Sequence, residues 1–172
     1  MEKKTLKNNN SNLISLSNNS VLSGKQLLLL IPLTKFYSSN NNIKKLKDIL
    51  DGTSKLSLRL VDWFVTNYSK KHFVIYSLND SRFKVYDDYK LKLRAYSKKR
   101  FDPFCRWDRI SIPYKDNARI QTTIGQLNFF KWALENNVIK ELEKNYSCVD
   151  HDMNYRTKNI KNFSINSNSS NS

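Results

Sequence analysis

The chain has little of the residues that build several common functional sites. Among its 172 residues there are 3 glycines and 2 cysteines, and no paired carboxylate motif stands out. So few glycines cannot supply a glycine-rich phosphate loop. Cys105 and Cys148 form no regular framework, which disfavours a secreted disulfide scaffold and favours a reducing, intracellular compartment.

Long apolar runs are also missing. The longest extends from Leu27 to Leu33, far short of the roughly 20 residues that a membrane span needs. The polar, basic start of the chain has no apolar run behind it, so we expect neither a signal peptide nor a membrane span. Pro32 argues against a helix interior or a central strand, which predicts a short edge strand or a docking segment at 27–33.

Acidic residues are scarce relative to basic ones. The chain has 15 Asp and Glu against 30 Lys and Arg, a formal net charge of +15 and a pI of about 9.8. This balance favours association with nucleic acid, an anionic membrane or an acidic protein. An AT-rich genome, whose codons favour Lys, Asn and Ile, is the alternative source of the same charge.

Asn and Ser dominate both ends of the chain. They supply 10 of the 13 residues at 8–20 and 8 of the 9 residues at 164–172. Such segments bury too little apolar surface to offset the entropy of ordering, which predicts disorder. We expect a largely disordered region at 1–53 with short apolar and amphipathic segments, a compact domain at 54–146, and a disordered polar tail at 147–172.

Hydrophobic periodicity predicts a small α+β domain between the tails, with about three helices and one or two β-hairpins. Thr53 or Ser54 is expected to cap the first helix, and Thr123 with Gln126 the last. A short amphipathic helix at 43–50 should end at Asp51-Gly52. The main helices are expected at about 53–69, 87–100 and 123–144, and the strands at 73–78, 82–86, 109–113 and 118–122.

The middle of the chain combines positive charge with aromatic rings. Residues 55–116 hold 15 Lys or Arg against 7 Asp or Glu, and 13 of the 21 aromatic residues. Arg and Lys neutralise phosphates, and exposed rings stack on unpaired bases. Pro103 and Phe104 should set the turn of this region against the core. The predicted nucleic-acid-binding residues are Lys70, Lys71, Arg94, Tyr96, Lys98, Lys99, Arg100, Arg106, Trp107, Arg109 and Lys131. The alternative is an ordinary mixed-charge surface with Trp107 buried.

The helix expected at 123–144 allows two interpretations. Gln126, Asn128 and Lys131 near its start could read base edges in a major groove. A capped structural helix is favoured, because its apolar face completes the core.

Metal binding and catalysis are disfavoured. Cys148, Asp150, His151 and Asp152 lack the paired spacing of metal ligands, even with Cys105 and His72 added. Arg106 could lower the pKa of the Cys105 thiol, but no His stands near it in sequence. We expect no catalytic residue, no metal and no cofactor, and therefore a protein that is not an enzyme.

Three stretches of the chain resemble a known pattern. They are Tyr86, Tyr89 and Leu93 before Ser97-Lys98-Lys99, then Phe101-Asp102-Pro103-Phe104-Cys105-Arg106, then the run from Thr122 to Ala133. Through them, residues 56–145 resemble a small uncharacterised domain of nucleocytoplasmic large DNA viruses, the mimivirus-like group and its relatives. Trp107 stands where that pattern has a basic residue. The resemblance implies a viral source and no assigned activity.

These features together favour a non-enzymatic, basic viral protein that binds DNA or RNA through its Lys, Arg and aromatic residues. The alternative is a structural or scaffold protein of the virion that binds an acidic protein through the same surface. Either function would place the protein inside the host cell, in cytoplasm or nucleus, or in the virion.

Overall fold

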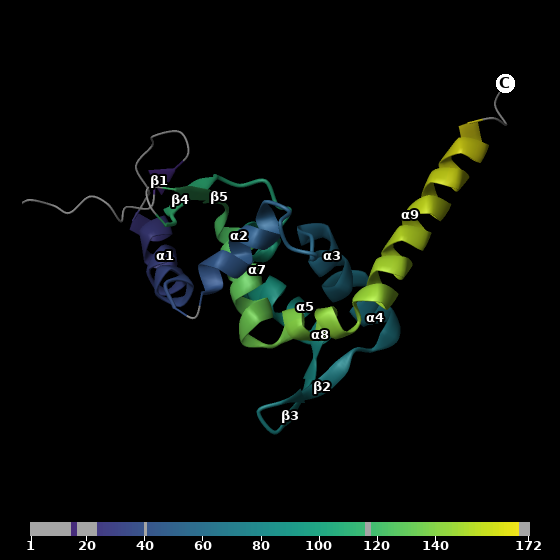
Figure 1. Ribbon diagram of the computed structural model, residues 1–172, viewed down its shortest axis with the longest axis horizontal. Coiled ribbons are helices and arrows are strands. Elements are labelled where there is room, and N and C mark those ends of the chain that lie inside the picture. Colours follow the sequence, from purple (N-terminus) through teal and green to yellow (C-terminus); the bar gives the residue numbers. More distant parts are fainter. Residues whose placement is uncertain (1–14, 17–23, 40, 116–117, 169–172) are drawn as a thin grey trace, which may run out of the picture.

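The computed structural model describes residues 15–16, 24–39, 41–115 and 118–168 and confirms the α+β class (Figure 1). Helices outnumber the three that were expected. The helices are α1 (Gly24–Tyr37), α2 (Asn42–Leu50), α3 (Leu58–Trp63), a π-helix (Phe64–Tyr68), α4 (Ser69–His72), α5 (Val85–Tyr96), α6 (Lys98–Phe101), α7 (Ile124–Glu135), α8 (Val138–Lys144) and α9 (Tyr146–Asn168). The strands are β1 (Ser15–Leu16), β2 (Ile75–Leu78), β3 (Ser81–Lys84), β4 (Ile110–Pro113) and β5 (Arg119–Thr122).

Both expected hairpins are present. β2 pairs with β3, and the turn residues Asn79 and Asp80 have φ of 48° and 59°. Positive φ at both positions is typical of the two-residue turns whose twist matches that of the strands. β4 pairs with β5, and β1 adds to the free edge of β4, so the larger sheet has the order β1-β4-β5.

Helix α7 lies at the centre of the molecule (Figure 1). Thr123 accepts a hydrogen bond from the Gln126 N–H, which confirms the cap. The rings of Tyr89, Phe101, Phe129 and Trp132 pack together against this helix, with centroids about 6 Å apart. The helix ends at Glu135, earlier than expected, because Asn137 has a left-handed backbone with φ of 57° and α8 then starts in a new direction.

Helix α1 corrects the interpretation of residues 27–33, and Pro32 lies inside it. Proline removes the hydrogen bond to the carbonyl four residues earlier, that of Leu28. Leu28 is 70% exposed, so water can satisfy that carbonyl. Leu30 and Leu33 are buried on the other side of the helix. The region 1–53 therefore contributes to the core, while residues 1–14 and 17–23 of the predicted tail lie outside the described part of the chain.

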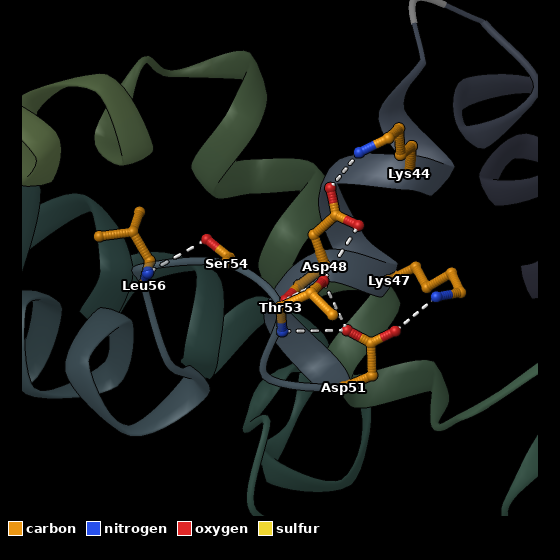
Figure 2. A network of polar contacts seen from close by, with 7 residues as sticks. All are labelled: Lys44, Lys47, Asp48, Asp51, Thr53, Ser54 and Leu56. Atoms are coloured by element: carbon orange, nitrogen blue, oxygen red, sulfur yellow. Dashed lines mark hydrogen bonds and ion pairs between the residues drawn. The ribbon is translucent and has the colours of Figure 1, made fainter.

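Helix α2 has the expected amphipathic character, and Gly52 follows its end with φ of 78°. The prediction that Thr53 or Ser54 caps the next helix was wrong. Figure 2 shows Thr53 bonded instead to Asp48 and Asp51, and Ser54 bonded to the N–H of Leu56. Both hydroxyls stabilise the connection between α2 and α3 through these hydrogen bonds.

Ser57 caps the first main helix by accepting a hydrogen bond from the Leu60 N–H. From there α3, the π-helix and α4 continue one another to His72. The wider turn of a π-helix adds one residue to the helical path, a feature that is frequent at functional sites.

Helix α9 occupies much of the region 147–172, where disorder was expected, and it extends away from the body (Figure 1). Val149 and Met153, one turn apart, are buried against the core. Trp63 on α3 donates a 3.0 Å hydrogen bond to Asp152, and Arg59 bonds Thr157. The packed part of the chain therefore extends on both sides of 54–146, and residues 169–172 lie outside the described part.

Candidate nucleic-acid interface

A basic hollow lies where the π-helix and α4 meet α5 and α9. Its volume is about 650 Å³. Lys70 and Lys71 come from α4, Lys90 from α5 and Arg156 from α9. None of the described residues that line it is an Asp or a Glu, and Thr66 and Asn67 of the π-helix add neutral polar groups. The hollow therefore concentrates positive charge from three elements that are distant in sequence.

Asp152 at the edge of this hollow neutralises part of its charge. It accepts a 2.9 Å ion pair from Lys71 and lies 3.9 Å from Arg156. Partial burial raises the pKa of Asp152, but hydrogen bonds from Lys71 and Trp63 outweigh it and hold the pKa below its ordinary value. Lys90 has no ion-pair partner among the described residues, so its charge is available to a ligand.

Lys70 lies over the ring of Tyr86, with its Nζ 5.6 Å from the ring centroid. A cation held over an aromatic face is attracted by the ring quadrupole. Lys70 is exposed and has no acidic partner among the described residues, so Tyr86 holds its ammonium at the wall of the hollow.

Helix α5 continues the line of cations away from the hollow. Arg94 lies one turn beyond Lys90, and residues four apart are neighbours on a helix surface. Both side chains are exposed. At the end of α5, Ser97 has φ of 70°, which turns the chain into the short helix α6.

Helix α6 carries Lys98, Lys99 and Arg100 at the surface, and contacts with α7 hold its backbone in place. Asn128 of α7 donates a 2.8 Å hydrogen bond to the Arg100 carbonyl. Gly125 of α7 lies so close that an added Cβ would be 2.7 Å from the Asp102 carbonyl oxygen. Lys98 pairs weakly with Asp102 at 3.8 Å. The three cations thus stand on a backbone held tightly against α7.

The two predicted rings are engaged with the core rather than free. Tyr96 stacks on the buried Phe101 with centroids 5.5 Å apart, and it is 40% exposed. Trp107 is half-buried and packs against the core. Arg106 and Arg109 on either side of it are exposed. Pro103 is buried as expected, but Phe104 is 52% exposed, so its expected packing against the core was wrong.

Helix α7 is structural, and its polar residues are occupied. Gln126 donates to the Pro103 carbonyl and accepts from Thr122, and Asn128 is buried. These contacts agree with the favoured interpretation of α7 as a capped structural helix. Lys131 pairs with Glu135 at 2.9 Å and lies over the Phe36 ring of α1. The structure therefore gives Lys131 a contact with α1 and does not bring it into the basic hollow.

Of the residues that line the hollow, the sequence predicted Lys70 and Lys71 as binding residues and missed the others, Lys90, Arg156 and Phe73 among them. Arg156 lies in the region 147–172, which the sequence predicts to be a disordered tail, and Lys90 is not among the predicted binding residues. The sequence predicts a strand from Phe73, but Phe73 lies before β2 and is 80% exposed. Its only sequence signal was its position after Lys70-Lys71-His72.

A second region with reactive side chains has no metal-binding geometry. Cys148, His151 and Asp152 of α9 line a hollow together with His72 of α4. No group of three or more His, Cys, Asp or Glu side chains in the described part of the chain is arranged to hold a metal ion.

Among the residues that the structure describes, no helix combines the length and apolarity needed to cross a membrane.

Comparison with known proteins identifies relatives of this chain. An uncharacterised protein of Acanthamoeba polyphaga mimivirus, L507, is 37% identical over 161 residues, which is 88% of this chain and 62% of the relative. The chain thus spans less than two thirds of that protein. No solved structure matches. The resemblance to an uncharacterised domain of large DNA viruses is confirmed. Residues 8–172 match a family of unknown function, DUF7197, and the chain belongs to this family.

Proposed function

We propose that the protein binds nucleic acid and does so without catalysing a reaction. The observation that carries the proposal is the basic hollow, with four cations and no lining acid among the described residues. In a concave site the potentials of such cations add, which attracts polyanions. The hollow thus supplies a fixed site for a phosphate group.

The remaining predicted cations extend this contact. Arg94 continues the line from Lys90 along α5, and the surface cations near α6 add further positive charge. We assign phosphate contacts in the basic hollow to Lys70, Lys71, Lys90 and Arg156. Beyond the hollow we assign them to Arg94, Lys98, Lys99, Arg100, Arg106 and Arg109. The proposed sites of action are the host cytoplasm or nucleus, and the virion.

The salt dependence of affinity tests this function. Each phosphate contact releases counterions, so log K should fall with log salt with a slope of about 0.7 to 0.9 per contact. Lys90→Ala should lower both the affinity and this slope, by about one contact's worth. The matched control is Lys45→Ala, because Lys45 lies on α2 beside Asp48, Glu135 and Glu143 and its loss changes the net charge equally.

Fluorescence anisotropy with labelled oligonucleotides from 50 to 300 mM salt measures these slopes. Affinity that does not vary with salt, or equal losses for Lys90→Ala and Lys45→Ala, would contradict the proposal. An acidic virion protein is the competing partner. Nuclease treatment of the purified complex distinguishes the two, because partners that persist after digestion are bound to the protein directly.

A further inference from the structure

Phe73 has a backbone and an exposure that folding alone does not explain. It follows α4 with φ of 50° and ψ of 51°, a left-handed conformation. The Val74 N–H donates to the Ser69 carbonyl, the hydrogen bond of a Schellman motif in which glycine usually occupies the position of Phe73. A bulky side chain is strained there. The ring is 80% exposed, so little burial offsets that strain.

Phe73 lies between two hollows. The first is the basic hollow, with Lys70, Lys71, Lys90 and Arg156. The second, the serine hollow, has a volume of about 390 Å³ and includes Ser69, Val74 and Lys84. Lys70, Phe73 and Tyr86 line both hollows and therefore form the wall between them.

Ser69 lines the serine hollow and carries a buried hydroxyl. The Ser69 hydroxyl is buried, and within the described part of the chain no hydrogen bond to it is formed. Leaving a buried hydroxyl unsatisfied destabilises a fold, so such a group calls for an explanation. Val74, Ile75 and the Tyr86 ring supply apolar walls beside it. A flat group with apolar faces and polar edges matches this combination.

We propose that an unpaired base of a single-stranded nucleic acid stacks on Phe73, with its adjoining phosphate in the basic hollow. The inference rests on the proposed function and specifies its ligand. Stacking on an exposed ring requires a base that is not already stacked and paired in a duplex, whereas phosphate contacts alone accept either form. DNA and RNA share the unpaired base and the phosphate, and the experiment compares both.

The test uses three labelled probes of equal length: oligo-dT, oligo-rU and a DNA duplex. Phe73→Gly should retain or increase the stability of the fold, because it relieves the left-handed strain. It should weaken single-strand binding about tenfold and leave duplex binding unchanged. Phe73→Tyr keeps a ring and should retain affinity. Tyr155→Ala, which removes a 60% exposed ring from α9, is the control and should change neither single-strand binding nor duplex binding.

The outcomes separate this inference from the proposed function. Binding of no probe overturns both. Salt-dependent binding in which Phe73→Gly weakens all probes equally, or none, overturns the base site alone and leaves the phosphate contacts in place. A crosslinking experiment adds a direct readout: photoactivated 5-iodouracil in the bound single strand should label a peptide that contains Phe73 or Tyr86. A label confined to α6 or the loop after it would contradict the placement.

Discussion

The hydroxyl of Tyr37 donates a 2.7 Å hydrogen bond to the backbone carbonyl of Leu127, which joins α1 to the central helix α7. The two residues lie 90 positions apart. Tyr37 is buried, and that burial raises the pKa of its phenol well above the ordinary value, so it stays protonated and able to donate. This contact ties the N-terminal helix to the core.

Tyr37→Phe should therefore destabilise the protein by about 1 kcal/mol, the usual net value of one buried hydrogen bond. The ring and its packing remain, so the loss reports the hydroxyl alone. Urea denaturation followed by circular dichroism measures the change. Tyr155→Phe, at an exposed position, should have almost no effect; a similar loss in both variants would mean that the contact with Leu127 contributes nothing specific.

Gly125→Ala tests the close approach of α7 to α6. The new Cβ would lie 2.7 Å from the Asp102 carbonyl oxygen and 3.2 Å from that of Lys99, and both are backbone atoms that cannot rotate away. We expect a net loss of about 1 to 2 kcal/mol, because the overpacking exceeds alanine's better helix propensity. Gly24→Ala is the control, since no atom of a described residue from another part of the chain lies within 4 Å of its added Cβ. Equal melting temperatures for the two variants would refute the steric argument.

Asp87 and Asp88 form a natural matched pair in the first turn of α5. Both carboxylates interact favourably with the positive end of the helix dipole. Only Asp88 also accepts the 2.6 Å hydrogen bond from the Trp132 indole N–H. Asp88→Ala should cost about 1.5 to 3 kcal/mol, the value for a bond to a charged acceptor. Asp87→Ala removes a 65% exposed carboxylate and should cost less than about 1 kcal/mol. Chemical denaturation of the two variants gives the comparison, and a difference near zero would count against the role of the indole bond.

Asp62 gives the protein a pH dependence. Burial, with a contribution from the negative charge of Asp102, raises the pKa of Asp62 from 3.8 to about 6. Between these pH values the folded state binds more protons than the unfolded state, so this carboxyl lowers stability as pH rises from about 4 to 6. Asp62→Asn should add roughly 1 to 2 kcal/mol at pH 7.5 after allowance for partial exposure, and little at pH 4. Denaturation at both pH values measures this, and an equal gain at each would point to packing rather than charge.

Local chemistry made several elements readable from the sequence. The strands expected at 73–78 and 82–86 predicted the β2–β3 hairpin, and Asp51-Gly52 predicted the end of α2. These signals act within a few residues, so distant parts of the chain do not alter them. Thr123 was likewise correctly read as the cap of α7.

The elements that were missed depend on partners far away in sequence. Pro32 disfavours a helix locally, but the burial of Leu30 and Leu33 outweighs that cost. Helix α9 is mostly polar, and its order relies on Val149 and Met153 meeting a surface that the sequence does not reveal. The same limit applies to the candidate site: Lys70 and Lys71 were identified, but Arg156 joins them only through the packing of α9.

The π-helix before α4 determines how the side chains of α4 are rotated about the helix axis. Such a turn corresponds to one inserted residue in an otherwise regular helix. Without that residue, the side chains of α4 would sit about 100° further round the helix axis. The side chains of Lys70 and Lys71, two of the four cations of the basic hollow, would be turned by the same angle. The extra residue of the π-helix at 64–68 thus sets the rotation of α4, and with it the position of two of the four cations of the hollow.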